Sequence, residues 1–170
     1  MPVDIIEFFD ISPYRWHSIL IAIMCGGMIG LERQLRGKPV GIRTASLITL
    51  GTYVFMATSA SLAADAYDPT RVMGQIITGI GFLGAGVMMA RDGAVVGVTS
   101  AATIWVLAAV GVMIGTGNLI AGVKVSLLVV GILYGVDILE RHIKMLTRGV
   151  HASFKNMHRK EVPDEGDKAP

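Results

Sequence analysis

Three long stretches without a charged residue constrain this chain more than any other feature. They run over Thr44–Ala64, Val72–Ala90 and Gly93–Val123, which are 21, 19 and 31 residues long. An α-helix needs about 20 consecutive apolar residues to cross the hydrocarbon core of a bilayer. Charged residues make up 16% of the sequence, whereas soluble domains contain about 25%. The sequence therefore predicts an all-α integral membrane protein.

Local signals divide the apolar stretches into about five spans. Ser12-Pro13 and Asp68-Pro69 each have the sequence of a helix cap followed by the first helical residue. The 31-residue stretch is too long for one helix, and the turn-forming residues Gly115–Asn118 interrupt it. The expected transmembrane helices are about Pro13–Glu32, Thr44–Ala64, Val72–Ala90, Val98–Ile114 and Leu119–Ile138.

The charges of the connecting loops predict the orientation. The loop Glu32–Arg43 has four basic residues and one acidic residue, a net charge of +3. Asp65–Arg71 has two acidic residues and one basic residue, a net charge of −1, and residues 140–160 have six basic residues and one acidic residue, a net charge of +5. Because loops rich in Lys and Arg stay in the cytoplasm, we expect the N-terminus outside and the C-terminus in the cytoplasm.

The chain is expected to have three parts. Residues 1–140 form the five-helix transmembrane domain. Residues 141–160 place apolar side chains three and four positions apart among basic ones, which indicates either an amphipathic helix on the anionic cytoplasmic leaflet or a simple topology anchor. Residues 161–170 are polar and are expected to form a disordered tail.

Glycines are concentrated in the expected spans. Gly26 and Gly30 have the spacing G-x-x-x-G, as do Gly111 and Gly115, and Gly131 and Gly135. The span Val72–Ala90 has the most glycines, at positions 74, 79, 81, 84 and 86. Helices in lipid gain no hydrophobic energy by pairing, and small residues allow their backbones to approach closely. The glycines therefore predict close helix packing, either within one chain or across a homodimer.

Several function classes find no support in the sequence. Gly79–Gly84 spells G-x-G-x-x-G, but it lies inside an apolar span and no acidic residue follows about 20 positions later, so it is not a dinucleotide site. With one cysteine, Cys25, the chain has no Cys-based zinc site, and no pair of its histidines has zinc-site spacing. We expect no enzymatic activity, no cofactor and no nucleic-acid partner, and the sequence leaves a metal site undetermined.

Glu32 is the polar residue that most needs an explanation. Its carboxylate lies at the C-terminal end of a helix, where the helix dipole is unfavourable to negative charge, and an ion within a membrane is costly. It should therefore pair with Arg33, Arg36 or Arg43. Two interpretations stay open: a loop ion pair, or a functional polar cluster of Glu32, Arg33, Arg36, Arg43 and Thr44. Gln75, Thr78, Thr99, Ser100 and Thr103 are expected to form interhelical hydrogen bonds.

Three ordered blocks of sequence, spread over about residues 15–140, resemble the MgtC/SapB family. The first is Gly30-Leu31-Glu32-Arg33-Gln34 with Gly41-Ile42-Arg43-Thr44, and the second runs from Asp68 to Gly86. The third runs from Gly97 to Trp105. The positions that carry the resemblance, besides the polar cluster, are Gly30, Gly41, Asp68, Arg71, Gln75, Gly79, Gly81, Gly84, Gly86, Thr99, Thr103 and Trp105.

The resemblance implies a multi-pass protein of the bacterial inner membrane that serves adaptation to low magnesium and, in pathogens, survival inside host cells. It implies a regulator rather than a transporter, and the lack of central carboxylates in the spans agrees, because Mg²⁺ prefers oxygen ligands. Virulence-type members add a soluble ACT-like domain, for which residues 141–170 are too few, so a short, membrane-only branch is expected.

Two functions are thus carried forward. The first is a non-enzymatic regulator in magnesium homeostasis or in low-magnesium or acid-stress adaptation, which packs against itself or another membrane protein. The alternative is a transporter of a divalent cation or a proton, with Glu32 and Arg43 at a cytoplasmic gate. In both, membrane lipids are partners.

Overall fold

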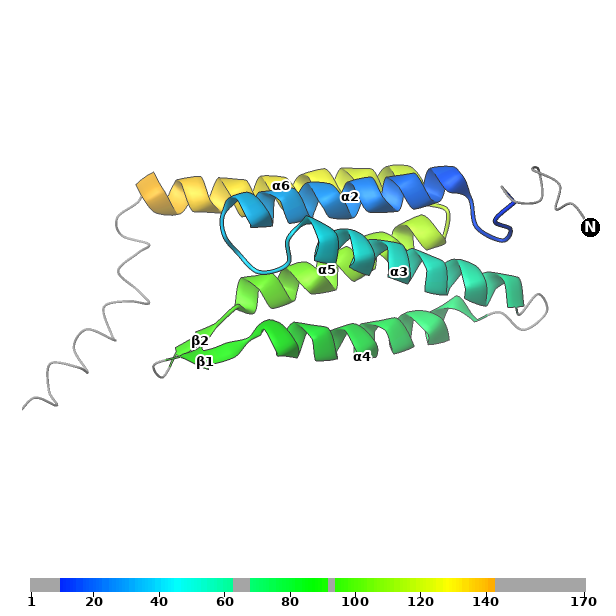
Figure 1. The fold of residues 1–170 in the computed structure, drawn as a ribbon, viewed down its shortest axis with the longest axis horizontal. Coiled ribbons are helices and arrows are strands. Elements are labelled where there is room, and N and C mark those ends of the chain that lie inside the picture. Colours follow the sequence, from blue (N-terminus) through cyan, green and yellow to red (C-terminus); the bar gives the residue numbers. More distant parts are fainter. Residues whose placement is uncertain (1–9, 63–67, 92–93, 143–170) are drawn as a thin grey trace, which may run out of the picture. The chain divides into compact units, whose positions relative to one another are not determined.

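The computed structural model describes residues 10–62, 68–91 and 94–142, and most of them are helical. The helices are α2 (Trp16–Leu35), α3 (Ile42–Leu62), α4 (Pro69–Val87), α5 (Val98–Gly115) and α6 (Leu119–His142). A short hairpin of β1 (Met89–Arg91) and β2 (Ala94–Val96) joins α4 to α5 (Figure 1). The all-α membrane class is confirmed. The basic segment expected over 141–160 lies outside the described residues from position 143 on, as does the whole tail 161–170.

Four of the five helices have the length and hydropathy of a transmembrane span. These are α2, α3, α5 and the Leu119–Leu139 part of α6. The fifth, α4, has 19 residues but is not among the four. Its Arg71, Gln75 and Thr78 reduce its mean hydropathy, and its glycines add little to it. The expected number of spans, about five, therefore matches the number of helices among the described residues but exceeds the number of them that meet both criteria.

The predicted start of the first span is wrong. α2 begins at Trp16, and Pro13 lies in a turn closed by a hydrogen bond from Tyr14 N to the Ile11 carbonyl, 2.9 Å. Two contacts hold this turn against α3: the Tyr14 hydroxyl lies 2.8 Å from Thr58 Oγ1, and Arg15 N donates to the Tyr53 hydroxyl at 3.0 Å. Tertiary contacts, rather than the local capping pair, thus determine where this helix starts.

The other predicted helix ends are mostly confirmed. Asp68 caps α4, with its carboxylate accepting hydrogen bonds from the backbone N–H groups of Thr70 and Arg71. α5 begins at Val98 as expected. The expected span Val72–Ala90 is wrong at its end, because α4 stops at Val87 and Ala90 pairs with Val95 across the hairpin.

Glycines allow α3 to pack closely between α2 and α5. A Cβ atom built at Gly26 would lie 2.6 Å from the Ala45 carbonyl oxygen of α3, and one at Gly111 would lie 2.6 Å from the Thr49 carbonyl oxygen. Real Cβ atoms do not come this close to the backbone, so both positions require glycine. The pairs Gly26/Gly30 and Gly111/Gly115 therefore serve packing within the chain, whereas Cβ atoms built at Gly131 and Gly135 would meet nothing within 4 Å in the described structure.

The chain divides into two compact units, 1–131 and 132–170, and the packing described here lies within the first. The buried core cluster of that unit contains Ala22 and Cys25 of α2, Tyr53 of α3, and Val110 and Ile114 of α5. α4 differs from these helices, since Gly84 is its one buried residue.

Candidate functional site

The predicted polar cluster lies at the end of the bundle where α2 ends and where α3 and α5 begin. Glu32 and Arg33 belong to the last turn of α2 and are buried, with 8% and 4% of their surface exposed. Ser100, in the first turn of α5, is also buried. Two adjacent ionisable side chains are thus held away from solvent, which is costly unless they are paired.

Arg36 is the cationic partner of Glu32. Arg36 Nε lies 2.6 Å from Glu32 Oε1, and the two residues are one helical turn apart. Arg43 is exposed in the first turn of α3. Of the three arginines that the sequence offers, Arg36 is therefore the partner, and the physical reason is local: Arg36 is the i+4 neighbour of Glu32, whereas Arg43 is on another helix and is exposed.

Arg33 connects α2 to α5. Its Nη2 donates a hydrogen bond to Ser100 Oγ at 2.7 Å, between residues 67 positions apart in the sequence. Arg33 Nε and Glu32 Oε2 are buried without a partner in the part of the chain that the structure describes, while Glu32 Oε1 faces Arg36 Nε. Glu32 is thus balanced in charge by Arg36 but retains unused acceptor capacity, so this is a site that could accept a proton or a further donor.

The two halves of the first sequence block meet in space. A Cβ atom at Gly30 would lie 2.7 Å from Ile42 Cα and 2.8 Å from the Gly41 carbonyl oxygen. Gln34 Oε1 accepts a hydrogen bond from Ile42 N at 3.3 Å. Gly30 and Gly41 therefore serve the close approach of α2 and α3, which holds the loop between them against the polar cluster. Thr44 is exposed beside this contact.

That loop contains an unusual backbone conformation. Val40 is buried and has φ +69°. A β-branched residue is an outlier in this left-handed region, which costs of order 1–3 kcal/mol when the surrounding structure imposes it. Gly37, with φ +62°, ends α2 without such strain.

The second and third sequence blocks meet where α4 and α5 adjoin. Gly84 of α4 packs on Ala101 of α5, with 3.7 Å between a built Cβ atom and the Ala101 Cβ atom. Gly97 has φ +93°, and a side chain there would collide with the Val87 carbonyl at the end of α4. Gly84 therefore serves the contact between the two helices, and Gly97 serves the turn from the hairpin into α5. Gly74, Gly79, Gly81 and Gly86 have open space where a side chain would be.

The expected interhelical hydrogen bonds are found only in part. Thr78 and Thr103 donate to carbonyl groups four residues earlier in their own helices, those of Gly74 and Thr99. Ser100 does bond to another helix, as the acceptor of Arg33. The remaining block residues, Arg71, Gln75, Thr99 and Trp105, are exposed in the chain.

Asp68 provides a prediction that depends on pH. Hydrogen bonds from the Thr70 side chain and backbone, with smaller contributions from the Arg71 amide and charge, hold the pKa of the Asp68 carboxyl below its ordinary value. The charged cap therefore stabilises the start of α4 at neutral pH, and this contribution disappears as the pH falls through the lowered pKa. Asp68→Ala should speed amide exchange at Thr70 and Arg71 at neutral pH, and Asp68→Asn, which keeps an acceptor oxygen but loses the charge, should give intermediate protection. Equal exchange in all three proteins would contradict the cap.

Metal-binding side chains do not gather in this site. Within residues 10–62, 68–91 and 94–142, no three His, Cys, Asp or Glu side chains are placed to hold a metal ion.

Comparison of the sequence with known proteins identifies the family of this chain. The sequence profile of the MgtC family matches residues 19–142. The chain is 45% identical over 117 residues to the putative magnesium transporter YhiD of Escherichia coli K12, which covers 65% of this chain and 54% of YhiD. It is 46% identical over 96 residues to protein MgtC of Brucella abortus, covering 56% of this chain and 40% of that protein.

A third relative, protein MgtC of Salmonella typhimurium LT2, is 43% identical over 101 residues, covering 59% of this chain and 43% of that protein. The chain spans about half the length of the curated relatives that it matches. No solved structure matches it significantly. The matched region contains all three sequence blocks and the helices that position them, which confirms the resemblance. The chain belongs to the MgtC family, as a membrane protein with several apolar helices.

Proposed function

We propose that this chain is a non-enzymatic regulator in the bacterial inner membrane, with a role in magnesium homeostasis or in low-magnesium or acid-stress adaptation. It crosses the membrane several times, with its N-terminus outside and its C-terminus in the cytoplasm, as the loop charges predict. It acts by packing α4 against a transmembrane helix of a second copy or of another membrane protein. The family membership supports the magnesium-related role.

The observation that carries this proposal is the uncovered surface of α4. Figure 1 shows α4 beside α5, to which the hairpin joins it. Gly84 is buried there, but Gly74, Gly79 and Gly81 have nothing at contact distance within the described structure. Phe82 is 82% exposed. Bare glycine surfaces of this kind favour close contact between helices in lipid.

A groove beside α4 could receive side chains of such a helix. It lies between α3 and α4, has a volume of about 500 Å³, and is lined mainly by apolar side chains together with Thr52 and Gln75. An amide in the hydrocarbon region is costly unless another group bonds to it. A docked helix that offers a polar group to Gln75 would remove this cost, whereas lipid chains cannot.

Cysteine cross-linking in native membranes tests the docking surface. The native Cys25 is buried, so an introduced cysteine gives a clear signal. Gly79→Cys lies on the open surface of α4, and Leu47→Cys, at an exposed position of α3, is the matched control. We expect oxidation to link Gly79→Cys chains into a dimer, or a bifunctional maleimide to link them to one membrane protein, with at least about tenfold less product from Leu47→Cys. Only monomer from both variants would contradict docking.

One observation favours the transporter as a second candidate. Oε2 of the buried Glu32 carboxylate has no partner in the described structure, so this oxygen could receive a cation or a proton. The relative YhiD is named a putative magnesium transporter. Since Arg43 is exposed, the gate would consist of Glu32 and Arg36. Purified protein in liposomes decides between the candidates: Mg²⁺ or proton flux that Glu32→Gln abolishes would replace the regulator, and no flux is expected from a regulator.

A further inference from the structure

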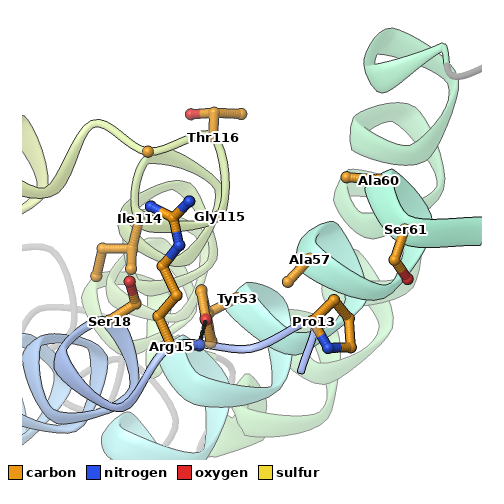
Figure 2. Close-up of a pocket in the computed structure, with 11 residues that line it drawn as sticks. Pro13, Arg15, Ser18, Tyr53, Ala57, Ala60, Ser61, Ile114, Gly115 and Thr116 are labelled. Atoms are coloured by element: carbon orange, nitrogen blue, oxygen red, sulfur yellow. Dashed lines mark hydrogen bonds between the residues drawn. The ribbon is translucent and has the colours of Figure 1, made fainter. Parts of the chain in front are cut away.

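A second polar site lies at the opposite end of the bundle from Glu32. A pocket of about 420 Å³ opens where α2 begins and where α3 and α5 end. Figure 2 shows the Arg15 side chain reaching across this pocket from the start of α2 toward Gly115 and Thr116, with Ser18 and Tyr53 beside it. We propose that this pocket binds a phosphate-bearing anion, the headgroup of an acidic phospholipid.

The cation in the pocket has no acidic partner in the chain as described. Arg15 is exposed, and no carboxylate of the described residues forms an ion pair with it. A guanidinium offers five donors in a planar fork that matches the oxygen atoms of a phosphate. Arg15 therefore provides the charge and the geometry that recognise such an anion.

The nearby end of α5 does not use these donors. Gly117, with φ +87°, turns the chain so that its N–H bonds to the Ile114 carbonyl and the Asn118 N–H bonds to the Met113 carbonyl. This is the Schellman arrangement, which satisfies the last carbonyl groups of a helix from its own backbone. Arg15 is thus not needed to cap α5, and its guanidinium remains available to a ligand.

Two hydroxyl groups in the pocket can each donate a hydrogen bond to a ligand. Ser18 is 4% exposed, and its hydroxyl has no hydrogen-bond partner in the described part of the chain. The Tyr53 hydroxyl oxygen accepts from Arg15 N, which leaves its own hydrogen free to donate. Ser18 Oγ is not among the enclosed polar atoms that lack a partner, so it opens to the pocket, where a ligand can reach it. An anion beside Arg15 could accept from both groups.

The position of the pocket favours a lipid as the source of the anion. Tyr14 and Trp16 flank Arg15, and such aromatic side chains are enriched at the headgroup level of membranes. Ala57 and Ala60 of α3 give the pocket an apolar wall, which suits the glycerol and upper acyl carbons. This site is separate from α4, so the inference does not depend on the proposed function.

Ligand-dependent thermal unfolding of the full chain in an uncharged detergent tests the site. Short-chain phosphatidylglycerol, inorganic phosphate and a short-chain diacylglycerol are the three probes. We expect phosphatidylglycerol to raise the unfolding temperature of the wild type, and Arg15→Gln to weaken its apparent affinity by about tenfold or more, since a charged hydrogen-bonding group is removed. Ser18→Ala should weaken it less.

Lys124→Gln is the matched control, since Lys124 is an exposed cation near the start of α6 that does not line this pocket. It should leave the affinity unchanged. If Arg15→Gln does not fold, Arg15→Lys, which keeps the charge but loses the fork, should still weaken binding. An Arg15-dependent shift with inorganic phosphate alone would assign the site to the free anion. No shift in the wild type, an equal shift in the Arg15 variants, or an equal shift with diacylglycerol would overturn the proposal.

Discussion

Replacing Gly26 with valine is expected to separate α2 from α3 and to destabilise the protein strongly. A Cβ atom there would meet the Ala45 carbonyl oxygen at 2.6 Å and Ser46 Cα at 2.7 Å. Both are backbone atoms, so no side-chain rotation relieves the clash. Overpacking costs about 1–3 kcal/mol and more where the backbone must shift, and we expect the unfolding temperature in detergent to fall by about 10 °C.

The adjacent residue offers a matched control. At Gly27 the nearest atom to a built Cβ is Ser46 Oγ at 3.4 Å, the end of a side chain that can rotate. Gly27→Val changes the same helix by the same atoms, so its intrinsic effect on α2 is equal and only the interhelical clash is missing. Equal destabilisation by the two variants would show that helix propensity, and not the contact with α3, requires glycine at position 26.

The glycine patterns in the sequence predicted close helix packing. They could not tell whether a given helix packs within the chain or against another chain. Gly26, Gly30 and Gly111 contact α3 within the chain, whereas Gly74 and Gly79 of α4 contact nothing in the described structure. The spacing of small residues is similar in these helices, and what differs is which surface the fold turns toward a neighbour. That property depends on the tertiary arrangement, so the sequence left both alternatives open.

The helices themselves were predictable because the bilayer fixes their length and composition. A run of about 20 apolar residues has few other structures available to it in lipid, and a cap such as Asp68 acts through its own neighbours. The hairpin was missed although Asp92-Gly93 is a dipeptide typical of tight hairpins. Its flanking residues are apolar, so the pattern merged with the adjoining spans.

The polar cluster was predicted as a set of residues but not as a set of contacts. Three arginines lie near Glu32 in the sequence, and the i, i+4 rule alone favours Arg36. The hydrogen bond from Arg33 to Ser100 joins residues far apart in the chain, so no local pattern indicates it. The Arg15 pocket was missed for the same reason, since it combines three helix ends.

Arg36→Gln is expected to destabilise the protein by about 3 kcal/mol or more, because it removes the ion-pair partner of the buried Glu32 carboxylate. The unfolding temperature in detergent should fall by about 10 °C. Arg43→Gln, which removes an equal charge from an exposed position in the same basic loop, should change stability by no more than about 0.5 kcal/mol.

The double variant Glu32→Gln/Arg36→Gln separates the ion pair from other contacts of Arg36. If the cost of Arg36→Gln is the uncompensated charge of Glu32, removing that charge as well should restore most of the lost stability, since a neutral pair carries a smaller desolvation cost. Additive losses in the double variant would mean that Arg36 acts through other partners. A larger loss from Arg43→Gln than from Arg36→Gln would instead support Arg43, another of the three arginines that the sequence offers, as the partner of Glu32, and the loop after α2 would then have a different arrangement in the membrane.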